Sequence, residues 1–93
     1  MNVMPISDLI DQVSQICKRN GVQRLDLFGS FATGTATARS DIDFVVYGCK
    51  DILHLEDELA DIDTLRKIDI FEYESIKNKF LKEDIEKYGK QIY

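Results

Sequence analysis

The sequence has little of what several common kinds of protein site require. It contains no tryptophan, one proline, one histidine and two cysteines in 93 residues. The single histidine, His54, excludes a zinc site built on several histidines, and we expect it on the surface. Cys17 and Cys49 lack the close spacing of metal-binding cysteines and have apolar neighbours, so we expect two buried thiols in a reducing cytoplasm.

Long apolar runs are also missing. No run approaches the roughly 20 residues that a membrane span requires. The N-terminus has no basic segment followed by a long apolar stretch, which is the pattern of a secretory signal. We therefore expect a cytoplasmic protein that does not enter a membrane.

Positive charge is scarce. Twelve lysines and arginines stand against 17 aspartates and glutamates, which gives a formal net charge of −5. Such a protein repels nucleic-acid backbones, and no basic stripe interleaved with aromatic residues is visible, so we expect no direct nucleic-acid binding. It can still bind a triphosphate if divalent cations neutralise both partners.

Hydrophobic spacing predicts an α/β (α+β) fold. Ile6 to Cys17 carries apolar residues at helical spacing, with Lys18 and Arg19 suited to the last turn and Gly21 to the C-terminal cap. The other predicted elements are strands at 22–28, 41–47 and 67–73, a short helical turn and loop at 30–40, helices at 51–65 and 75–88, and an extended tail at 90–93. The link between the first two strands is too short for a parallel crossover helix. The sequence thus predicts a single domain, 1–93, with a small mixed sheet flanked by helices.

Two carboxylates open the second predicted strand. Asp41 and Asp43 are two residues apart, so their side chains share one face, about 7 Å apart at the backbone. Ile42 and Phe44 beside them are apolar, and like charges on a buried strand repel each other. A divalent cation would turn this repulsion into shared attraction. The alternative is a solvated strand end with a turn-forming Ser-Asp.

Asp69 is a third carboxylate within an apolar strand. Brought next to the first two, it would complete a site for two magnesium ions, which such sites hold roughly 4 Å apart. Oxygen-only ligands suit magnesium or manganese rather than zinc. The alternative for Asp69 alone is an edge strand with one polar face.

Gly29 and Ser30 follow the first strand directly. A glycine lets the backbone approach a ligand closely, and free N–H groups at the start of a helical turn can hold phosphate oxygens. A plain strand-to-helix turn is the alternative. The pairing with the acidic strand favours the phosphate site, because both parts would face one pocket.

Together, these segments resemble a known family. Residues 29–34 (Gly-Ser-Phe-Ala-Thr-Gly) and 40–44 (Ser-Asp-Ile-Asp-Phe) are similar to the signature of the DNA polymerase β-like nucleotidyltransferase superfamily. The small size and the ending Ile92-Tyr93 resemble its minimal nucleotidyltransferase (MNT) branch. The resemblance covers nearly the whole chain and implies a nucleotidyltransferase fold.

The resemblance also implies roles. Gly29, Ser30 and Ser40 would bind the nucleotide, with ATP as substrate. Asp41, Asp43 and Asp69 would be the catalytic and metal-binding carboxylates for two Mg²⁺ ions, with Asp69 activating the attacking hydroxyl.

Similar proteins act as antitoxins beside a HEPN-domain toxin, and some transfer AMP to a tyrosine of that toxin. The expected partner is therefore a HEPN-type toxin, in a hetero-oligomer. A second hypothesis is a module that neutralises its partner by binding alone, with little or no catalysis.

One position departs from the family. Phe31 stands where many members carry an arginine after the Gly-Ser pair. Arg39 is a candidate for supplying the missing charge, and a solvated loop arginine is the alternative. The acidic residues of the helix at 51–65 indicate either a solvated face or a docking surface for a basic partner.

Overall fold

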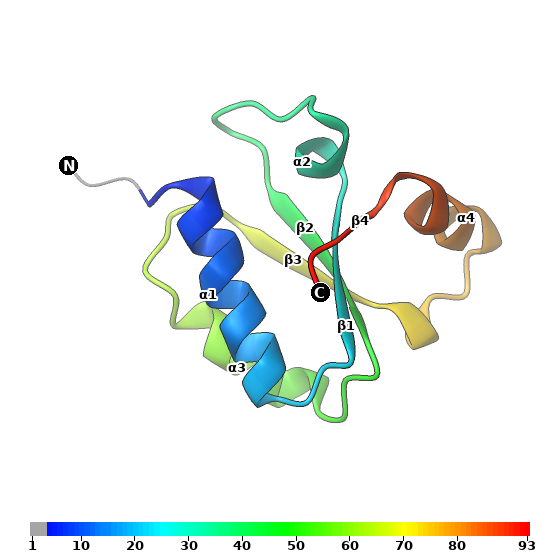
Figure 1. The fold of residues 1–93 in the computed structure, drawn as a ribbon, viewed down its shortest axis with the longest axis horizontal. Helices are drawn as coiled ribbons and strands as arrows, with labels where there is room; N and C mark the ends of the chain where they lie inside the picture. Colours follow the sequence, from blue (N-terminus) through cyan, green and yellow to red (C-terminus); the bar gives the residue numbers. More distant parts are fainter. Residues whose placement is uncertain (1–3) are drawn as a thin grey trace.

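The computed structural model describes residues 4–93 (Figure 1). Its elements follow in the order α1 (Ile6–Arg19), β1 (Arg24–Phe28), α2 (Ser30–Thr33), β2 (Ile42–Tyr47), α3 (Ile52–Ala60), β3 (Ile68–Glu72), the 3-10 turn η1 (Tyr73–Ser75), α4 (Lys79–Tyr88) and β4 (Lys90–Gln91).

The strands form one mixed sheet. Their order is β3-β2-β1-β4, with β2 antiparallel to β1 and parallel to β3, and β4 antiparallel to β1. The predicted small mixed sheet is therefore confirmed. The extended tail joins the sheet as β4, at the outer edge of β1.

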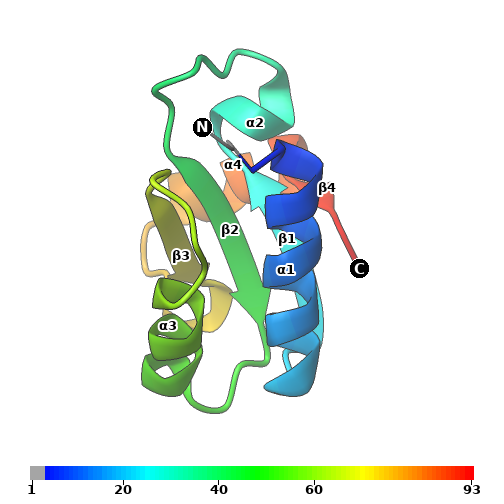
Figure 2. The same ribbon diagram turned by 90° about the vertical axis from the view of Figure 1, so that its left-hand side faces the viewer.

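The main core lies between the sheet and two helices. Figure 2 shows α1 and α3 side by side in front of the sheet, with α4 behind it. Strand residues at alternate positions point into this core, and Ile42, Phe44 and Val46 are fully buried there. The opposite face is covered only in part, with Val45 and Ile85 of α4 buried on that side. This alternation puts every second residue of β2 on the face away from the main core.

The end of α1 fixes the entry into β1. Gly21 has φ +74°, and the N–H groups of Gly21 and Val22 donate to the carbonyls of Lys18 and Cys17. This is a Schellman motif, in which the residue after the cap needs a left-handed conformation that glycine adopts without strain. The cap residue itself is Asn20, one position before the predicted Gly21.

The helix predicted at 51–65 is shorter. It ends at Ala60, and Asp61 and Ile62 donate to the carbonyls of Glu58 and Leu59 in tight three-residue turns. Aspartate side chains compete with the helical backbone for hydrogen bonds, which favours an ending here. Ile62 remains buried. The apolar spacing therefore predicted its burial correctly, but the prediction that it lies in the helix was wrong.

The helix predicted at 75–88 begins later, at Lys79. The Asn78 side chain caps it by accepting hydrogen bonds from the N–H groups of Phe80 and Leu81. An asparagine cap satisfies donors that have no partner within the helix. The predicted end of this helix at residue 88 is confirmed, and Gly89 is its C-cap residue.

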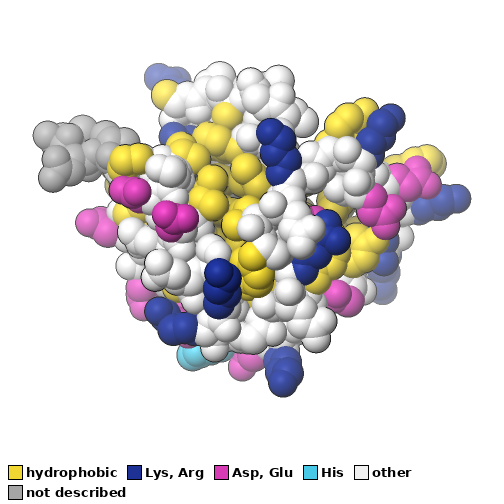
Figure 3. Space-filling model, in the orientation of Figure 1, with side chains coloured by type: hydrophobic (Ala, Val, Ile, Leu, Met, Phe, Trp, Pro, Cys, Tyr) yellow, Lys and Arg dark blue, Asp and Glu magenta, His cyan; other side chains and the backbone are white. Residues whose placement is uncertain are grey.

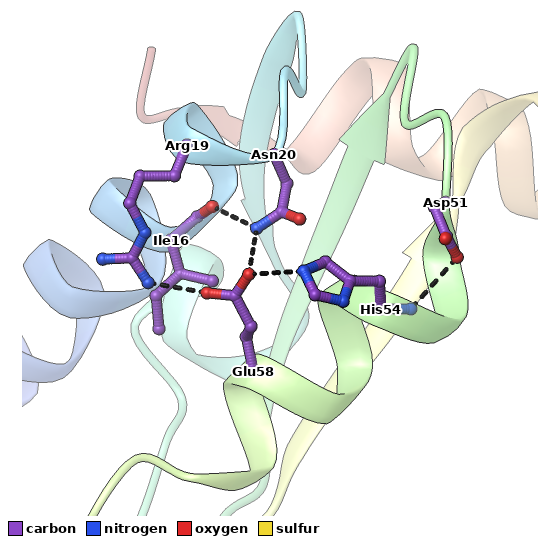
Figure 4. A network of polar contacts seen from close by, with 6 residues as sticks. All are labelled: Ile16, Arg19, Asn20, Asp51, His54 and Glu58. Atoms are coloured by element: carbon purple, nitrogen blue, oxygen red, sulfur yellow. Dashed lines mark hydrogen bonds and ion pairs between the residues drawn. The ribbon is translucent and has the colours of Figure 1, made fainter.

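A polar network joins the C-terminal end of α1 to α3 (Figure 4). Glu58 accepts from Arg19 at 2.6 Å and from Asn20 at 3.1 Å, and it pairs with His54 at 2.9 Å. Asp51 caps the start of the same helix by accepting from the His54 N–H. His54 is exposed, as predicted, and its contact partner is on its own helix.

The two cysteines differ in their surroundings. Both are free thiols; Cys17 is buried in the core, while Cys49 is only half-buried. The prediction of two buried thiols is therefore correct for Cys17 and wrong for Cys49. Cys49 lies in the turn after β2, where less of the chain covers it.

The surface carries mixed charge. On the face shown in Figure 3, apolar side chains gather in a central area, and positive and negative side chains are interspersed around it. No helix within residues 4–93 is long and apolar enough to cross a membrane.

Candidate active site

The site is built on the parallel pair β2 and β3. Asp43 and Asp69 face each other in register on these two strands, on the sheet face away from the main core. Ile42 and Phe44, on either side of Asp43, are fully buried, whereas Asp43 and Asp69 are half-buried. The strand alternation therefore places two carboxylates together over an apolar layer.

The carboxylates of Asp43 and Asp69 repel each other electrostatically. Burial raises the pKa of the Asp43 carboxyl above its ordinary value, and the charge of Asp69, a hydrogen bond with it and the charge of Asp41 raise this pKa further. Lys67 acts in the opposite direction, and its ammonium lies 3.6 Å from Asp69. Burial and like charge both disfavour the ionised form. A cation at this position would remove that cost.

Gly29 closes one side of the site. Phe28 of β1 pairs with Asp43, so Gly29 follows directly beside the carboxylate. Its backbone has φ +72° and ψ −150°, a conformation that is nearly restricted to glycine. A Cβ at Gly29 would overlap the Asp43 carboxylate and lie 3.3 Å from its Cγ. The missing side chain is thus what allows the backbone to approach Asp43.

Ser30 begins the single turn α2. No side chain caps this turn, because Gly29 is the N-cap residue and has none to offer. The carbonyl of Gly29 accepts from the N–H groups of Ala32 and Thr33, which holds the turn against the end of β1. The first N–H groups of the turn therefore have no side-chain acceptor and suit an anion.

Ser40 closes the turn that leads into β2. Its hydroxyl accepts the Thr37 N–H at 2.8 Å, and its own N–H donates to the Thr37 carbonyl. Asp41 follows, exposed, just before β2 begins. The structure brings Asp43 and Asp69 together and leaves Asp41 at the rim, where its charge still acts on Asp43.

Two cavities lie beside the segments that carry Asp41 and Asp69. One, of about 650 Å³, is lined by Ser40 and Asp41 among others, and one, of about 330 Å³, is lined by Asp69. Arg66 lines both cavities. Asp41 and Asp69 therefore each border a cavity, whereas Asp43 lines neither of the two.

The donor set fits a divalent metal in its chemistry. Asp43 and Asp69 offer only oxygen atoms, and their mutual repulsion is the state that a hard cation relieves. In the described part of the chain, however, no three His, Cys, Asp or Glu side chains converge closely enough to form a complete metal-binding group. Asp43 and Asp69 are the pair that could hold a cation, and Asp41 is the nearest further carboxylate in sequence.

Asp26 is not among the predicted site residues, and it is the most deeply buried carboxylate. It lies on β1 and is 1% exposed. The Arg24 guanidinium donates to both of its oxygens, and the Tyr47 hydroxyl donates to it at 2.9 Å. Its charge is paired and hydrogen-bonded, so its role is structural. The alternation Leu25-Asp26-Leu27 was the only signal in the sequence that it faces away from the core.

Comparison with known proteins agrees with this geometry. The mixed sheet flanked by helices is a nucleotidyltransferase fold, with paired strand carboxylates beside a glycine-serine turn. Residues 11–93 match the family model described as "Polymerase beta, Nucleotidyltransferase". The chain belongs to this family of nucleotidyltransferases, which confirms the resemblance found in the sequence.

Individual relatives agree. The chain is 34% identical over 90 residues to the "Putative protein adenylyltransferase MJ0128" of Methanocaldococcus jannaschii, covering 90% of this chain and 91% of that one. A chain from a toxin-antitoxin crystal structure with AMP-PNP superposes with a TM-score of 0.71 at 27% identity, covering 89% of this chain and 71% of that chain. A structure described as a "putative minimal nucleotidyltransferase" gives a TM-score of 0.63 at 25% identity, over 97% and 96%.

Proposed function

We propose that this chain is a Mg²⁺-dependent nucleotidyltransferase that moves AMP from ATP to a tyrosine hydroxyl of a partner HEPN-type toxin, and so acts as its antitoxin. The observation that carries the proposal is the in-register pair Asp43 and Asp69 beside Gly29. The relative named as a protein adenylyltransferase supports the reaction class. The similar toxin-antitoxin chain with AMP-PNP supports both the nucleotide and the kind of partner.

In this reaction the acceptor oxygen bonds to the α-phosphorus of ATP. The bond from that phosphorus to the bridging oxygen breaks, and pyrophosphate leaves. The acceptor proton passes to a carboxylate, which we assign to Asp69. The first N–H groups of α2, at Ser30, orient the phosphate chain, while Ser40 holds the turn that carries Asp41. Most of the rate gain comes from positioning and charge neutralisation.

Two Mg²⁺ ions are proposed to be held by Asp41, Asp43 and Asp69. When bound, they neutralise phosphate charge and polarise the reacting phosphoryl group. Asp43 is the central ligand in this assignment, because it neighbours both Asp69 and Gly29.

The test is a mass measurement on both proteins. The chain is purified from its source lysate together with the partner that it binds, the pair is incubated with ATP and magnesium, and both intact masses are determined. We expect a gain of one AMP on the partner, lost in Asp43→Asn and retained in Asp84→Asn, which removes an exposed charge on α4. AMP transfer by Asp43→Asn at the rate of the unmodified chain would refute the assignment.

A second candidate function is neutralisation by binding alone. Two observations favour it: Phe31, which carries no charge, follows Ser30 directly, and the three carboxylates do not converge within residues 4–93. In that case Asp43→Asn would still form the complex and silence the toxin, and neither chain would gain mass. Loss of neutralisation in Asp43→Asn, with the complex intact, would exclude it.

A further inference from the structure

Arg66 links the three segments that form the site. It lies in the connection between α3 and β3 and is half-buried. One guanidinium nitrogen donates to the Ser40 carbonyl, and the guanidinium carbon lies 5.0 Å from the centre of the Phe31 ring. An arginine over an aromatic face gains cation–π attraction, and its planar group is held in a fixed orientation. Phe31 and Ser40 therefore hold this positive charge at the site.

The charge of Arg66 is not neutralised by a carboxylate of the described residues. Arg19 and Arg24 each pair with a carboxylate, whereas no ion pair within 4.0 Å involves Arg66 in the part of the chain that the structure describes. It lines two cavities, one of which it shares with Asp69 and the other with Ser40 and Asp41. A half-buried guanidinium with free donors next to a cavity suits a phosphate group, which it can bind through two parallel hydrogen bonds.

We propose that Arg66 binds the phosphate chain of the nucleotide, supplying the charge that the glycine-serine motif of this chain lacks at Phe31. The Phe31 ring supports a guanidinium that reaches the site from the connection before β3 rather than from α2. The proposal rests on the proposed function, since it names a residue that binds the substrate of that same reaction.

Arg39, the sequence-based candidate for this charge, is placed less well. It is exposed, and its backbone N–H, rather than its guanidinium, donates to the Thr37 hydroxyl. It lines only the larger cavity, away from Asp69. Arg39→Gln is therefore the matched control: the same residue type, the same charge change and the same neighbourhood.

The experiment measures binding rather than turnover. ATP and inorganic tripolyphosphate are titrated by calorimetry into the chain and into Arg66→Gln and Arg39→Gln, with thermal melting as the check of folding. We expect Arg66→Gln to weaken both ligands about tenfold, which corresponds to about 1.4 kcal/mol, and Arg39→Gln to leave both unchanged. Arg66→Lys keeps the charge without the planar group, and we expect an intermediate loss; it replaces Arg66→Gln if that variant does not fold.

A second series in EDTA separates direct contact from a structural role. If Arg66 only tied down the Ser40 carbonyl, its loss would disturb Asp41 and weaken binding only when magnesium is present. Direct contact predicts the same fold-loss for tripolyphosphate with and without magnesium. Phe31→Arg added to Arg66→Gln is expected to restore affinity, because it returns a guanidinium to the site.

The outcomes separate the two proposals. Unchanged affinity in folded Arg66→Gln, a loss confined to magnesium, or a loss in Arg39→Gln instead would overturn the assignment of Arg66 and leave the nucleotidyltransferase reaction standing. Failure of the unmodified chain to bind ATP with magnesium would overturn the proposed function, and the assignment of Arg66 with it.

Discussion

Replacing Gly29 by alanine tests whether the close approach to Asp43 is needed. The backbone there (φ +72°, ψ −150°) is strained for any other residue, at about 1–3 kcal/mol. The added Cβ would overlap the Asp43 carboxylate, which must move away. A misplacement of about 1 Å at reacting groups can cost on the order of a hundredfold in rate. We expect Gly29→Ala to unfold more easily and to lose AMP transfer by about that factor.

Gly34→Ala is the matched control for backbone strain. Gly34 has φ +79° and ψ 17°, and a Cβ there would meet nothing within 4 Å. The left-handed conformation costs alanine about 1–2 kcal/mol, and each kcal/mol lowers the melting temperature of a domain of this size by about 4–8 °C. Both variants should therefore melt earlier, but only Gly29→Ala should lose activity.

The assay combines thermal melting with transfer of labelled AMP to the partner, measured below both melting temperatures. Equal transfer rates in Gly29→Ala and Gly34→Ala would refute the reasoning, because they would show that crowding of Asp43 has no consequence. Complete unfolding of Gly29→Ala, with Gly34→Ala still folded, would also contradict the reasoning, because it would require a larger destabilisation than about 1–3 kcal/mol of backbone strain.

Three further predictions concern pKa shifts. The raised pKa of Asp43 means that ionisation of this carboxyl opposes folding. The protonated carboxyl contributes stability that is present below its ordinary pKa and is lost as pH rises through the raised pKa. Asp43→Asn in EDTA should therefore melt at a higher temperature than the unmodified chain at neutral pH, and a gain that persists in acid would contradict this. A hydrogen bond from Arg19 is the largest cause of the lowered pKa of Glu58, so the ionised carboxylate contributes stability that is present above its ordinary pKa and is lost as pH falls through the lowered pKa. Glu58→Gln should therefore melt at a lower temperature than the unmodified chain at neutral pH and at the same temperature in strong acid. Equal melting at neutral pH would show that the network has no effect on stability. Burial raises the pKa of Cys17 to about 12, so iodoacetamide at neutral pH should label the half-buried Cys49 before Cys17. Peptide mapping with and without urea measures the labelling of each thiol. Equal labelling of the two thiols in the native chain would contradict the burial of Cys17.

Much of the fold could be predicted from local patterns. Apolar spacing predicted α1 and the buried strand β2, and the motif from Gly29 to Asp43 indicated the family. These features could be predicted because each of the three patterns lies within a short stretch of sequence. The ends of helices were less predictable. The end of α3 at Ala60 depends on local competition for backbone hydrogen bonds, and the apolar Ile62 beyond it still packs into the core.

The sequence predicts which residues form the site, a prediction that stays open, but it does not predict how they are arranged. Alternation placed Asp41 and Asp43 on one face, but the register that sets Asp43 beside Asp69 arises from the pairing of β2 with β3, which is a long-range property. The contact between Phe31 and Arg66 is also a long-range property, because no spacing rule relates the helical turn α2 to the connection before β3. The roles of these residues stay predictions until the variants above are measured.

The parallel register of β2 and β3 makes the length of one connection critical. A single residue inserted between Asp61 and Lys67 that shifted β3 by one position would turn Asp69 into the core and bring an apolar side chain to the site, because strand faces alternate. The loop between α2 and β2 has no such constraint, since β1 and β2 are held by their own antiparallel pairing. Among relatives, we therefore expect length variation to collect at 34–39 and to be rare at 61–67, so the length of the connection before β3 carries information about the site.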